Sequence, residues 1–202
     1  MTGRPRVAVV DHADSFTYNL VHALDAVGAT CRVVRHDVAT IDELLAEDGV
    51  LLSAGPCSPR ETGVTVEFLK TVIERGGPPV LGVCLGHQCI AYAVGAPIER
   101  ASRPLHGKVA RVRHDGDGLF AGCPNPMVFA RYNSLSVGAL PSELVPCAWD
   151  EDGQLMALRH RTRRIDGVQF HPESHLSVGG ELLFRNWVRG LGRGASLRAT
   201  TG

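Results

Sequence analysis

The sequence has no excess of charge and no long apolar segment, and these two absences limit the classes of partner. Its 202 residues include 21 Lys and Arg and 21 Asp and Glu, so the formal net charge is zero, and no basic cluster stands out. Nothing therefore indicates binding to nucleic acid or to an anionic membrane. No apolar stretch approaches the length that spans a bilayer, and residues 1–6 lead directly into a predicted strand rather than a signal peptide. We expect a cytoplasmic protein with no membrane or nucleic-acid partner.

Cysteine patterns typical of metal sites or of disulfide scaffolds are also missing. The six cysteines include no Cys-x-x-Cys pair, and the nine histidines are scattered along the chain, so we expect no metal site. The chain is larger than disulfide-rich scaffolds and has no secretory signal, which favours free thiols. No internal repeat is found either.

The first half of the sequence contains alternating strand and helix patterns. With 44% hydrophobic residues, we expect one domain over residues 1–190 and a disordered tail at 191–202, which is rich in Gly, Ser, Thr and Arg. Strands are predicted at 7–10, 31–35, 50–52 and 79–83, and helices at 16–27, 41–46, 64–74 and 88–94. Such alternation implies a parallel sheet, and ligands bind such sheets at the carboxyl ends of the strands.

The second half of the chain changes to strands and turns. Period-two patterns and apolar runs predict strands at 109–113, 127–130, 146–150, 155–160 and 165–170, and a last helix at 181–188. The predicted fold class is α/β, with a mostly parallel central sheet flanked by helices and a smaller antiparallel sheet in the C-terminal half.

One stretch of the first half has the features of a nucleophile site. The motif Gly82-x-Cys84-x-Gly86 lies between an apolar strand and a helix, and its small flanking residues permit a sharp turn that exposes the central side chain. Cys84 would then lie at a helix N-terminus, whose positive end favours the reactive thiolate. The alternative is a structural cysteine buried beside a tight turn, and the motif alone does not decide between the two.

A base for this nucleophile is found near the end of the chain. His171 follows an apolar strand, Pro172 fixes the direction of the chain, and Glu173 comes two positions after the histidine. Each of these residues alone is common in a structural or surface role. Together, the order Cys84, His171, Glu173 matches a nucleophile, a general base and a carboxylate that orients the imidazole.

With the motifs at 82–88 and 167–174, the chain resembles the class I (triad) glutamine amidotransferases. The resemblance extends from residue 11 to the last predicted helix and implies a flavodoxin-like fold. It also implies that Cys84 attacks the side-chain amide of glutamine, that His171 passes the thiol proton to the departing ammonia, and that Glu173 orients His171.

The resemblance also implies which residues hold the substrate. The family's Gly-Pro loop supplies a backbone N–H to the tetrahedral oxyanion; this position matches Gly55, and the N–H of Leu85 is the second donor. Gln88 matches the residue that recognises glutamine. Ser134 and Leu135 match residues whose backbone groups hold the α-amino and α-carboxyl ends of the substrate.

Two positions depart from the family pattern. Cys57 stands where the loop usually has a second glycine, so a positive φ at this position would strain the backbone. Asn133 replaces the histidine of the family's Tyr-His-Ser-Leu segment, which we expect to affect communication with a partner more than the chemistry. Without the resemblance, residues 132–135 would be predicted as a solvated loop.

Further segments resemble the branch of the family that serves chorismate-aminating enzymes; they are residues 14–20, 105–108, 118–120, 131–132 and 156–160. In that branch, the segment that matches His106, Gly107 and Lys108 belongs to the interface with a synthase subunit; the alternative is a turn before a strand. The resemblance implies a heterodimer or larger heteromer in which ammonia passes to a chorismate-binding partner. No cofactor is expected in this chain, and Mg²⁺ is expected in the partner synthase subunit.

The product depends on the partner, so several interpretations stay open. Residues 144–149 and the arginines after Met156 resemble the amidotransferase halves of 4-amino-4-deoxychorismate synthases, which favours this synthase as the partner. The alternatives are component II of anthranilate synthase, a subunit that serves both synthases, and a subunit for 2-amino-2-deoxyisochorismate. Two hypotheses belong to other functional classes. A non-catalytic regulatory subunit is disfavoured because all three triad residues are present, and a free-standing γ-glutamyl hydrolase is disfavoured by the segment 106–108.

Overall fold

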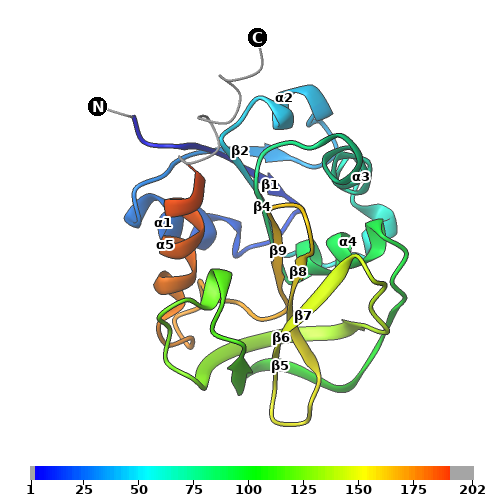
Figure 1. The fold of residues 1–202 in the computed structure, drawn as a ribbon, viewed down its shortest axis with the longest axis vertical. Helices are drawn as coiled ribbons and strands as arrows, with labels where there is room; N and C mark the ends of the chain where they lie inside the picture. Colours follow the sequence, from blue (N-terminus) through cyan, green and yellow to red (C-terminus); the bar gives the residue numbers. More distant parts are fainter. Residues whose placement is uncertain (1–2, 192–202) are drawn as a thin grey trace.

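The computed structural model describes residues 3–191, which are built around one nine-stranded sheet (Figure 1). The strands follow the order β2-β1-β3-β4-β9-β8-β7-β5-β6 across the sheet. Their bounds are β1 Arg6–Asp11, β2 Thr30–Arg35, β3 Gly49–Leu52, β4 Val80–Val83, β5 Ile98–His114, β6 Met127–Val137, β7 Leu144–Trp149, β8 Leu155–His160 and β9 Ile165–Val168. A single sheet therefore connects the N-terminal and C-terminal parts of the chain.

Strands β2, β1, β3, β4 and β9 pair in parallel and form one half of the sheet. Their side chains alternate between two apolar clusters: Val7 and Val9 of β1 belong to one, whereas Ala8 and Val10 belong to the other. β1, β3 and β4 are buried on both faces, so each contains a continuous apolar run, whereas the edge strand β2 is half-exposed and β9 contains Asp166. This is the physical reason why the sequence located these three strands.

Helices cover both faces of the parallel half (Figure 1). Their bounds are α1 Thr17–Ala26, α2 Ile41–Leu45, α3 Thr65–Arg75, α4 Leu85–Ala93 and α5 Gly180–Leu191. The predicted ends of these helices agree with the observed ends to within three residues. α1 and α5 pack together on one face, and α2, α3 and α4 cover the other. Leu191, which the predicted tail included, is the buried last residue of α5; residues 192–202 lie outside the described residues.

Strands β8, β7, β5 and β6 continue the sheet with antiparallel pairing. The predicted separate antiparallel sheet is not confirmed, because β8 pairs with β9 and joins the two halves into one mixed sheet. Strands β5 and β6 are also much longer than the predicted ranges 109–113 and 127–130. Register shifts interrupt the pairing of β5 with β6, and such bulges break the period-two pattern that marks a strand in the sequence.

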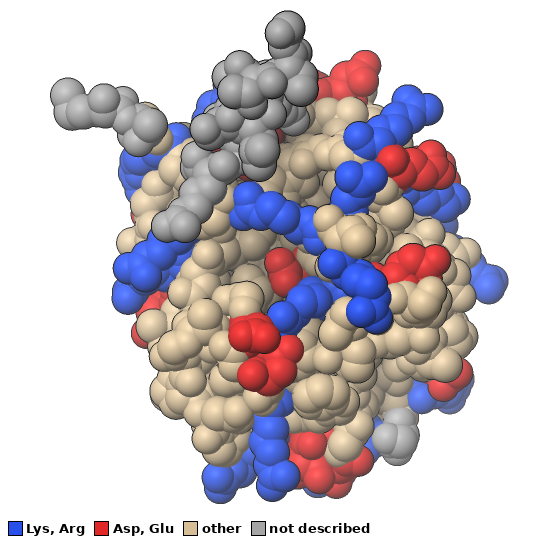
Figure 2. All heavy atoms as spheres, in the orientation of Figure 1, with Lys and Arg blue, Asp and Glu red and all other residues tan. Residues whose placement is uncertain are grey.

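Charged side chains of both signs are interspersed on the face of the molecule in Figure 2, with uncharged surface between them. This distribution agrees with the formal net charge of zero. Within residues 3–191, no helix combines the length and the apolar character needed to cross a membrane.

Candidate active site

The predicted nucleophile lies at the turn between β4 and α4. Cys84 has φ +53° and ψ −97°, a conformation that costs about 1–3 kcal/mol in a residue with a side chain. A Cβ on Gly82 would lie 2.5 Å from the Gly86 backbone, and a Cβ on Gly86 would collide with the Leu52 carbonyl. Only glycine therefore fits at both positions, and the sharp turn holds Cys84 immediately before the first residue of α4.

His171 and Glu173 lie just beyond β9 and form a buried, hydrogen-bonded pair. The distance from His171 Nδ1 to Glu173 Oε1 is 2.7 Å, and the two side chains are 2% and 0% exposed. Burial lowers the pKa of His171, but the adjacent Cys84 thiol and the Glu173 carboxylate together raise it well above its ordinary value. Within the described residues, His171 Nε2 has no partner in hydrogen-bonding geometry. The thiol and the imidazole are thus neighbours without a closed hydrogen bond, which is common in sites without substrate.

Two aromatic rings border the imidazole of His171. The ring centroids of Phe16 and Tyr132 lie 5.6 Å and 5.0 Å from that of His171, and 5.2 Å from each other. Their contact restricts the imidazole to the orientation that Glu173 sets. Sequence analysis did not assign either ring to the site, although Tyr132 belongs to the segment that the family resemblance matched.

The loop after β3 brings Gly55 against the start of α4. A Cβ on Gly55 would lie 2.6 Å from Leu85 Cδ2 and 2.7 Å from His12 Cβ, so the close approach requires glycine. Leu85 is the first residue of α4, where backbone N–H groups have no acceptor within the helix. The two residues predicted as oxyanion donors are therefore neighbours beside Cys84.

Cys57, the departure from the family's loop pattern, is not strained. Among the non-glycine residues of the described chain, positive φ occurs at Ala13 and Cys84 and not at Cys57. Burial also raises the pKa of the Cys57 thiol, which disfavours its reactive form. The loop therefore does not impose on Cys57 the positive φ that would strain its backbone.

A buried histidine that the sequence did not single out supports the Gly55 loop. His12 donates its backbone N–H to Ser53 Oγ at 3.0 Å, and its Nε2 lies 2.8 Å from Thr65 Oγ1. Burial lowers the pKa of His12 to about 4, so its imidazole is neutral near pH 7. Because its Nδ1 also lies 3.1 Å from the Ser53 carbonyl oxygen, the ring connects the end of β1 with the start of the loop and with α3.

Two glutamine side chains connect the thiol with β6. Gln169 Nε2 donates to Cys84 Sγ at 3.5 Å, and Gln88 Nε2 donates to Gln169 Oε1 at 3.1 Å and to the Leu135 carbonyl at 3.2 Å. Gln88 was predicted to recognise the substrate, whereas Gln169 was missed. The signal for Gln169 in the sequence is a polar residue between an apolar strand and His171; in the structure it is fully buried.

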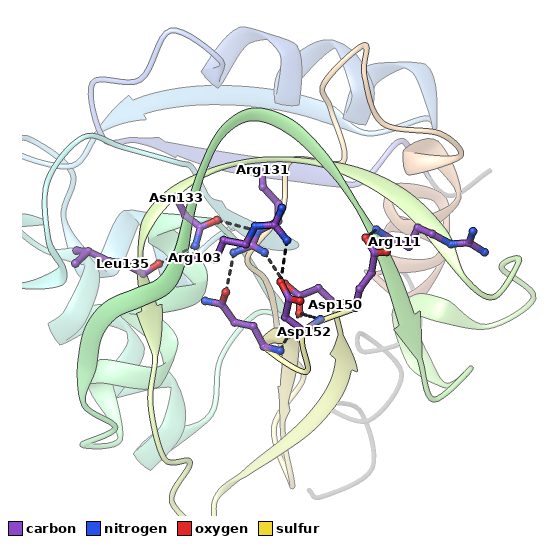
Figure 3. A network of polar contacts seen from close by, with 9 residues as sticks. Arg103, Arg111, Arg131, Asn133, Leu135, Asp150 and Asp152 are labelled. Atoms are coloured by element: carbon purple, nitrogen blue, oxygen red, sulfur yellow. Dashed lines mark hydrogen bonds and ion pairs between the residues drawn. The ribbon is translucent and has the colours of Figure 1, made fainter.

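Ser134 and Leu135 lie within β6, so the interpretation of residues 132–135 as a solvated loop is wrong. The Leu135 carbonyl accepts from Gln88, whereas Ser134 is exposed. Asn133 accepts a hydrogen bond from Arg131 Nε at 3.1 Å and donates to the Leu135 carbonyl at 2.9 Å (Figure 3). The residue that departs from the family's histidine is therefore part of a buried polar network.

His106, Gly107 and Lys108 are exposed residues of β5, and the alternative of a turn before a strand is wrong. A bulge between His106 and Lys108 gives Gly107 a φ of +65°. The register places His106 opposite Tyr132 and Lys108 opposite Arg131. The segment thus borders residues that reach the site, and its role as a partner interface stays a prediction.

All six cysteine thiols are free, as predicted. In the part of the chain that the structure describes, no group of three or more His, Cys, Asp or Glu side chains is arranged to hold a metal ion. The expectation that this chain needs no cofactor stays a prediction.

The sequence is similar to those of known proteins. The family model for glutamine amidotransferase class-I matches residues 8–191, which confirms the resemblance drawn from the motifs. Aminodeoxychorismate/anthranilate synthase component 2 of Bacillus subtilis (strain 168) is 44% identical over 186 residues, 90% of this chain and 95% of that protein. Anthranilate synthase component 2 of Thermus thermophilus is 44% identical over 188 residues, 91% of either chain. Aminodeoxychorismate synthase of Streptomyces griseus is 50% identical over 185 residues, 90% of this chain but 25% of that longer protein.

A solved structure has the same fold. The crystal structure of a protein from Thermoplasma acidophilum, described as part of a GMP synthase, superposes with a TM-score of 0.86 and 27% identity. The superposition covers 98% of both chains. The mixed sheet with helices on both faces is therefore shared across its whole length.

Proposed function

This chain belongs to the class-I glutamine amidotransferase family, and we propose that it is the glutaminase subunit of a chorismate-aminating synthase. The observation that carries the proposal is the strained turn that holds Cys84 beside the buried pair His171 and Glu173. A non-catalytic subunit with the same fold is not favoured, because Cys84 and the hydrogen-bonded pair His171 and Glu173 are all present and lie together.

Cys84 is the nucleophile of the proposed reaction. His171 removes the thiol proton, and Sγ attacks the carboxamide carbon of glutamine; the N–H groups of Gly55 and Leu85 bind the oxyanion that forms. The C–N bond then breaks, His171 gives its proton to the leaving amine, and ammonia departs from a thioester on Cys84. Water, deprotonated by His171, cleaves the thioester and releases glutamate. Glu173 keeps the imidazole in one tautomer and orientation throughout.

Glutamine is held between α4 and β6. Because both protons of Gln88 Nε2 are used by Gln169 and the Leu135 carbonyl, Gln88 Oε1 is the atom that accepts a hydrogen bond from the substrate. Backbone groups of Ser134 and Leu135 bind the α-amino and α-carboxyl ends. Gln169 holds the thiol at the position of attack.

The ammonia passes to a chorismate-binding partner subunit in a heterodimer or larger heteromer. Support comes from relatives named as component 2 of such synthases and from the exposed segment 106–108 beside Tyr132. We favour 4-amino-4-deoxychorismate as the product, because residues 144–149 and the arginines after Met156 resemble the amidotransferase halves of its synthase; the identities of the relatives do not separate it from anthranilate. Anthranilate, both products, or 2-amino-2-deoxyisochorismate are the alternatives. Mg²⁺ would belong to the partner.

The test is Cys84→Ala in the assembled complex with chorismate and Mg²⁺. Glutamine-dependent product formation should fall by more than about 10⁴-fold, since removal of a nucleophile has an effect of this order. Ammonia-dependent product formation should stay at the wild-type rate, and chromatography of the product identifies the synthase. Retained glutamine-dependent activity in Cys84→Ala would overturn the mechanism.

A further inference from the structure

A buried ion pair in the antiparallel half has no part in the proposed reaction. Arg131 Nη1 donates to Asp150, and the two side chains are only 1% and 3% exposed (Figure 3). The pair borders a cavity of about 310 Å³ that Lys108 also lines. Burying a charged pair is unfavourable unless its remaining hydrogen-bonding groups are satisfied, and in some proteins such pairs specify a geometry rather than add stability.

The hydrogen bonds of Arg131 fix the orientation of its guanidinium. In addition to Asp150, the fork donates from Nη2 to Gln154 Oε1 at 2.9 Å and from Nε to Asn133 Oδ1 at 3.1 Å. Asp150 is held in turn, because its Oδ1 accepts the backbone N–H groups of Asp152 at 3.0 Å and Gln154 at 2.8 Å. Arg131 therefore presents Nε to Asn133 in one direction only.

Asn133 connects the fixed guanidinium of Arg131 to the proposed glutamine pocket. Its Nδ2 donates to the Leu135 carbonyl at 2.9 Å, and Gln88 Nε2 donates to the same oxygen at 3.2 Å. Both lone pairs of the Leu135 oxygen are then used, so its peptide plane cannot rotate without breaking a buried hydrogen bond. Through Gln88 the hydrogen bonds continue to Gln169, which donates to the nucleophile.

We propose that Arg131 is a positioning residue of the glutamine pocket, which acts through Asn133 to fix the Leu135 carbonyl and the amide of Gln88. The inference rests on the proposed function, because it assumes that Gln88 and Leu135 bind glutamine. Loss of the hydrogen bonds from Arg131 to Asn133 and from Asn133 to Leu135 weakens glutamine binding. It leaves the partner's use of free ammonia unchanged.

Position 133 tests this role because it needs two different groups. The side chain must accept from Arg131 and donate to the Leu135 carbonyl, and a carboxamide does both. A neutral imidazole also carries one acceptor and one donor nitrogen, and the nearby cation of Arg131 favours the neutral form. A carboxylate satisfies Arg131 but has no proton for the Leu135 oxygen.

The experiment compares Asn133→Asp, Asn133→His and Arg131→Lys in the assembled complex. Asn133→Asp should raise the KM for glutamine about tenfold, the effect of one lost buried hydrogen bond, whereas Asn133→His should stay within about twofold of wild type. Arg131→Lys keeps the charge opposite Asp150 but lacks the planar fork that holds Asn133, so it should raise KM by a similar factor. In all three variants, ammonia-dependent product formation should match wild type.

A matched control is Asn186→Ala in α5. Asn186 Nδ2 donates to the Leu119 and Ala121 carbonyls, both at 2.9 Å, and none of the glutamine-pocket residues is among these partners. Its loss should lower thermal stability without changing KM.

A folded Asn133→Asp with wild-type KM, or a parallel fall of ammonia-dependent activity, overturns the positioning role. If Asn133→Asp does not fold, Arg131→Lys decides by the same criterion. Absence of glutamine-dependent activity in the wild-type complex would instead overturn the proposed function.

Discussion

In the parallel half of the sheet the site residues follow the ends of strands, whereas in the antiparallel half they lie within a strand. Cys84, Gly55 and His171 come directly after or shortly beyond β4, β3 and β9. Asn133 and Leu135 are interior residues of β6. The groups proposed to react therefore come from turns that close backbone approaches fix, whereas the groups proposed to bind glutamine lie on β6 and on α4, where side-chain hydrogen bonds hold them.

This difference separates the expected effects of substitution. Gly82, Gly86 and Gly55 leave no space for a side chain, so changes in the parallel half should disturb folding together with the reaction. The antiparallel half relies on hydrogen bonds such as that between Asn133 and Leu135, and these can be removed one at a time. Changes there should alter substrate binding before they alter the fold.

The largest expected difference between the two halves is in the stability of two glycine variants, one from each half. In Gly86→Ala the new Cβ meets the Leu52 carbonyl, and the loss of unfolding free energy should be about 3 kcal/mol, as for severe overpacking. Gly153 in the turn between β7 and β8 has φ +79° and open space around it, so Gly153→Ala should cost only about 1 kcal/mol of left-handed strain. Urea unfolding of both variants measures the difference, and equal losses would contradict the comparison.

The same contrast explains which strands could be predicted. β1, β3 and β4 are apolar on both faces, so each run was visible without knowledge of its neighbours. In β5, exposed residues such as Arg103 and Lys108 and the bulge at Gly107 remove the alternation. β6 is a strand along its whole length because it pairs with β5, and the local sequence pattern does not indicate this pairing.

Acid should destabilise the parallel half through His87, which is fully buried in α4. Burial lowers its pKa to about 4, against a smaller opposing effect of the Gly167 backbone. An unfolded histidine takes up a proton below about pH 6.5, so the stability is complete above that pH and falls as the pH drops towards 4. His87→Leu should therefore lose about 2 kcal/mol less than wild type between pH 7 and pH 5.

Urea unfolding at the two pH values measures this difference. A variant as sensitive to acid as wild type would show that His87 is not the group that takes up the proton. At pH 7 the substitution should change stability by less than about 1.5 kcal/mol, since it replaces a buried imidazole with an apolar side chain of similar size.

The candidate site residues that could be predicted are those that lie in local motifs. Cys84, Gln88 and His171 lie in short segments whose chemistry is readable, and the resemblance supplied Gly55 and Leu135. His12, Phe16 and Gln169 could not be found in this way, because each acts through contacts between elements that are distant in sequence. The hydrogen bond from Gln169 to Cys84, for example, joins residues 85 positions apart.

Gln169 is where the two halves meet, so its substitution gives the smallest and most specific test. Gln169→Leu removes the donor to Cys84 and the acceptor for Gln88, and glutamine-dependent kcat/KM should fall about tenfold, or 1.4 kcal/mol, with contributions from both kcat and KM. Gln169→Glu keeps the acceptor for Gln88 but places a carboxylate against the thiolate, so it should lower kcat and leave KM near wild type. Steady-state kinetics of the complex with glutamine and with ammonia separates these outcomes. If both variants changed KM alone, Gln169 would contribute to glutamine binding and not to the reaction. The reacting groups would then include Cys84 but not Gln169.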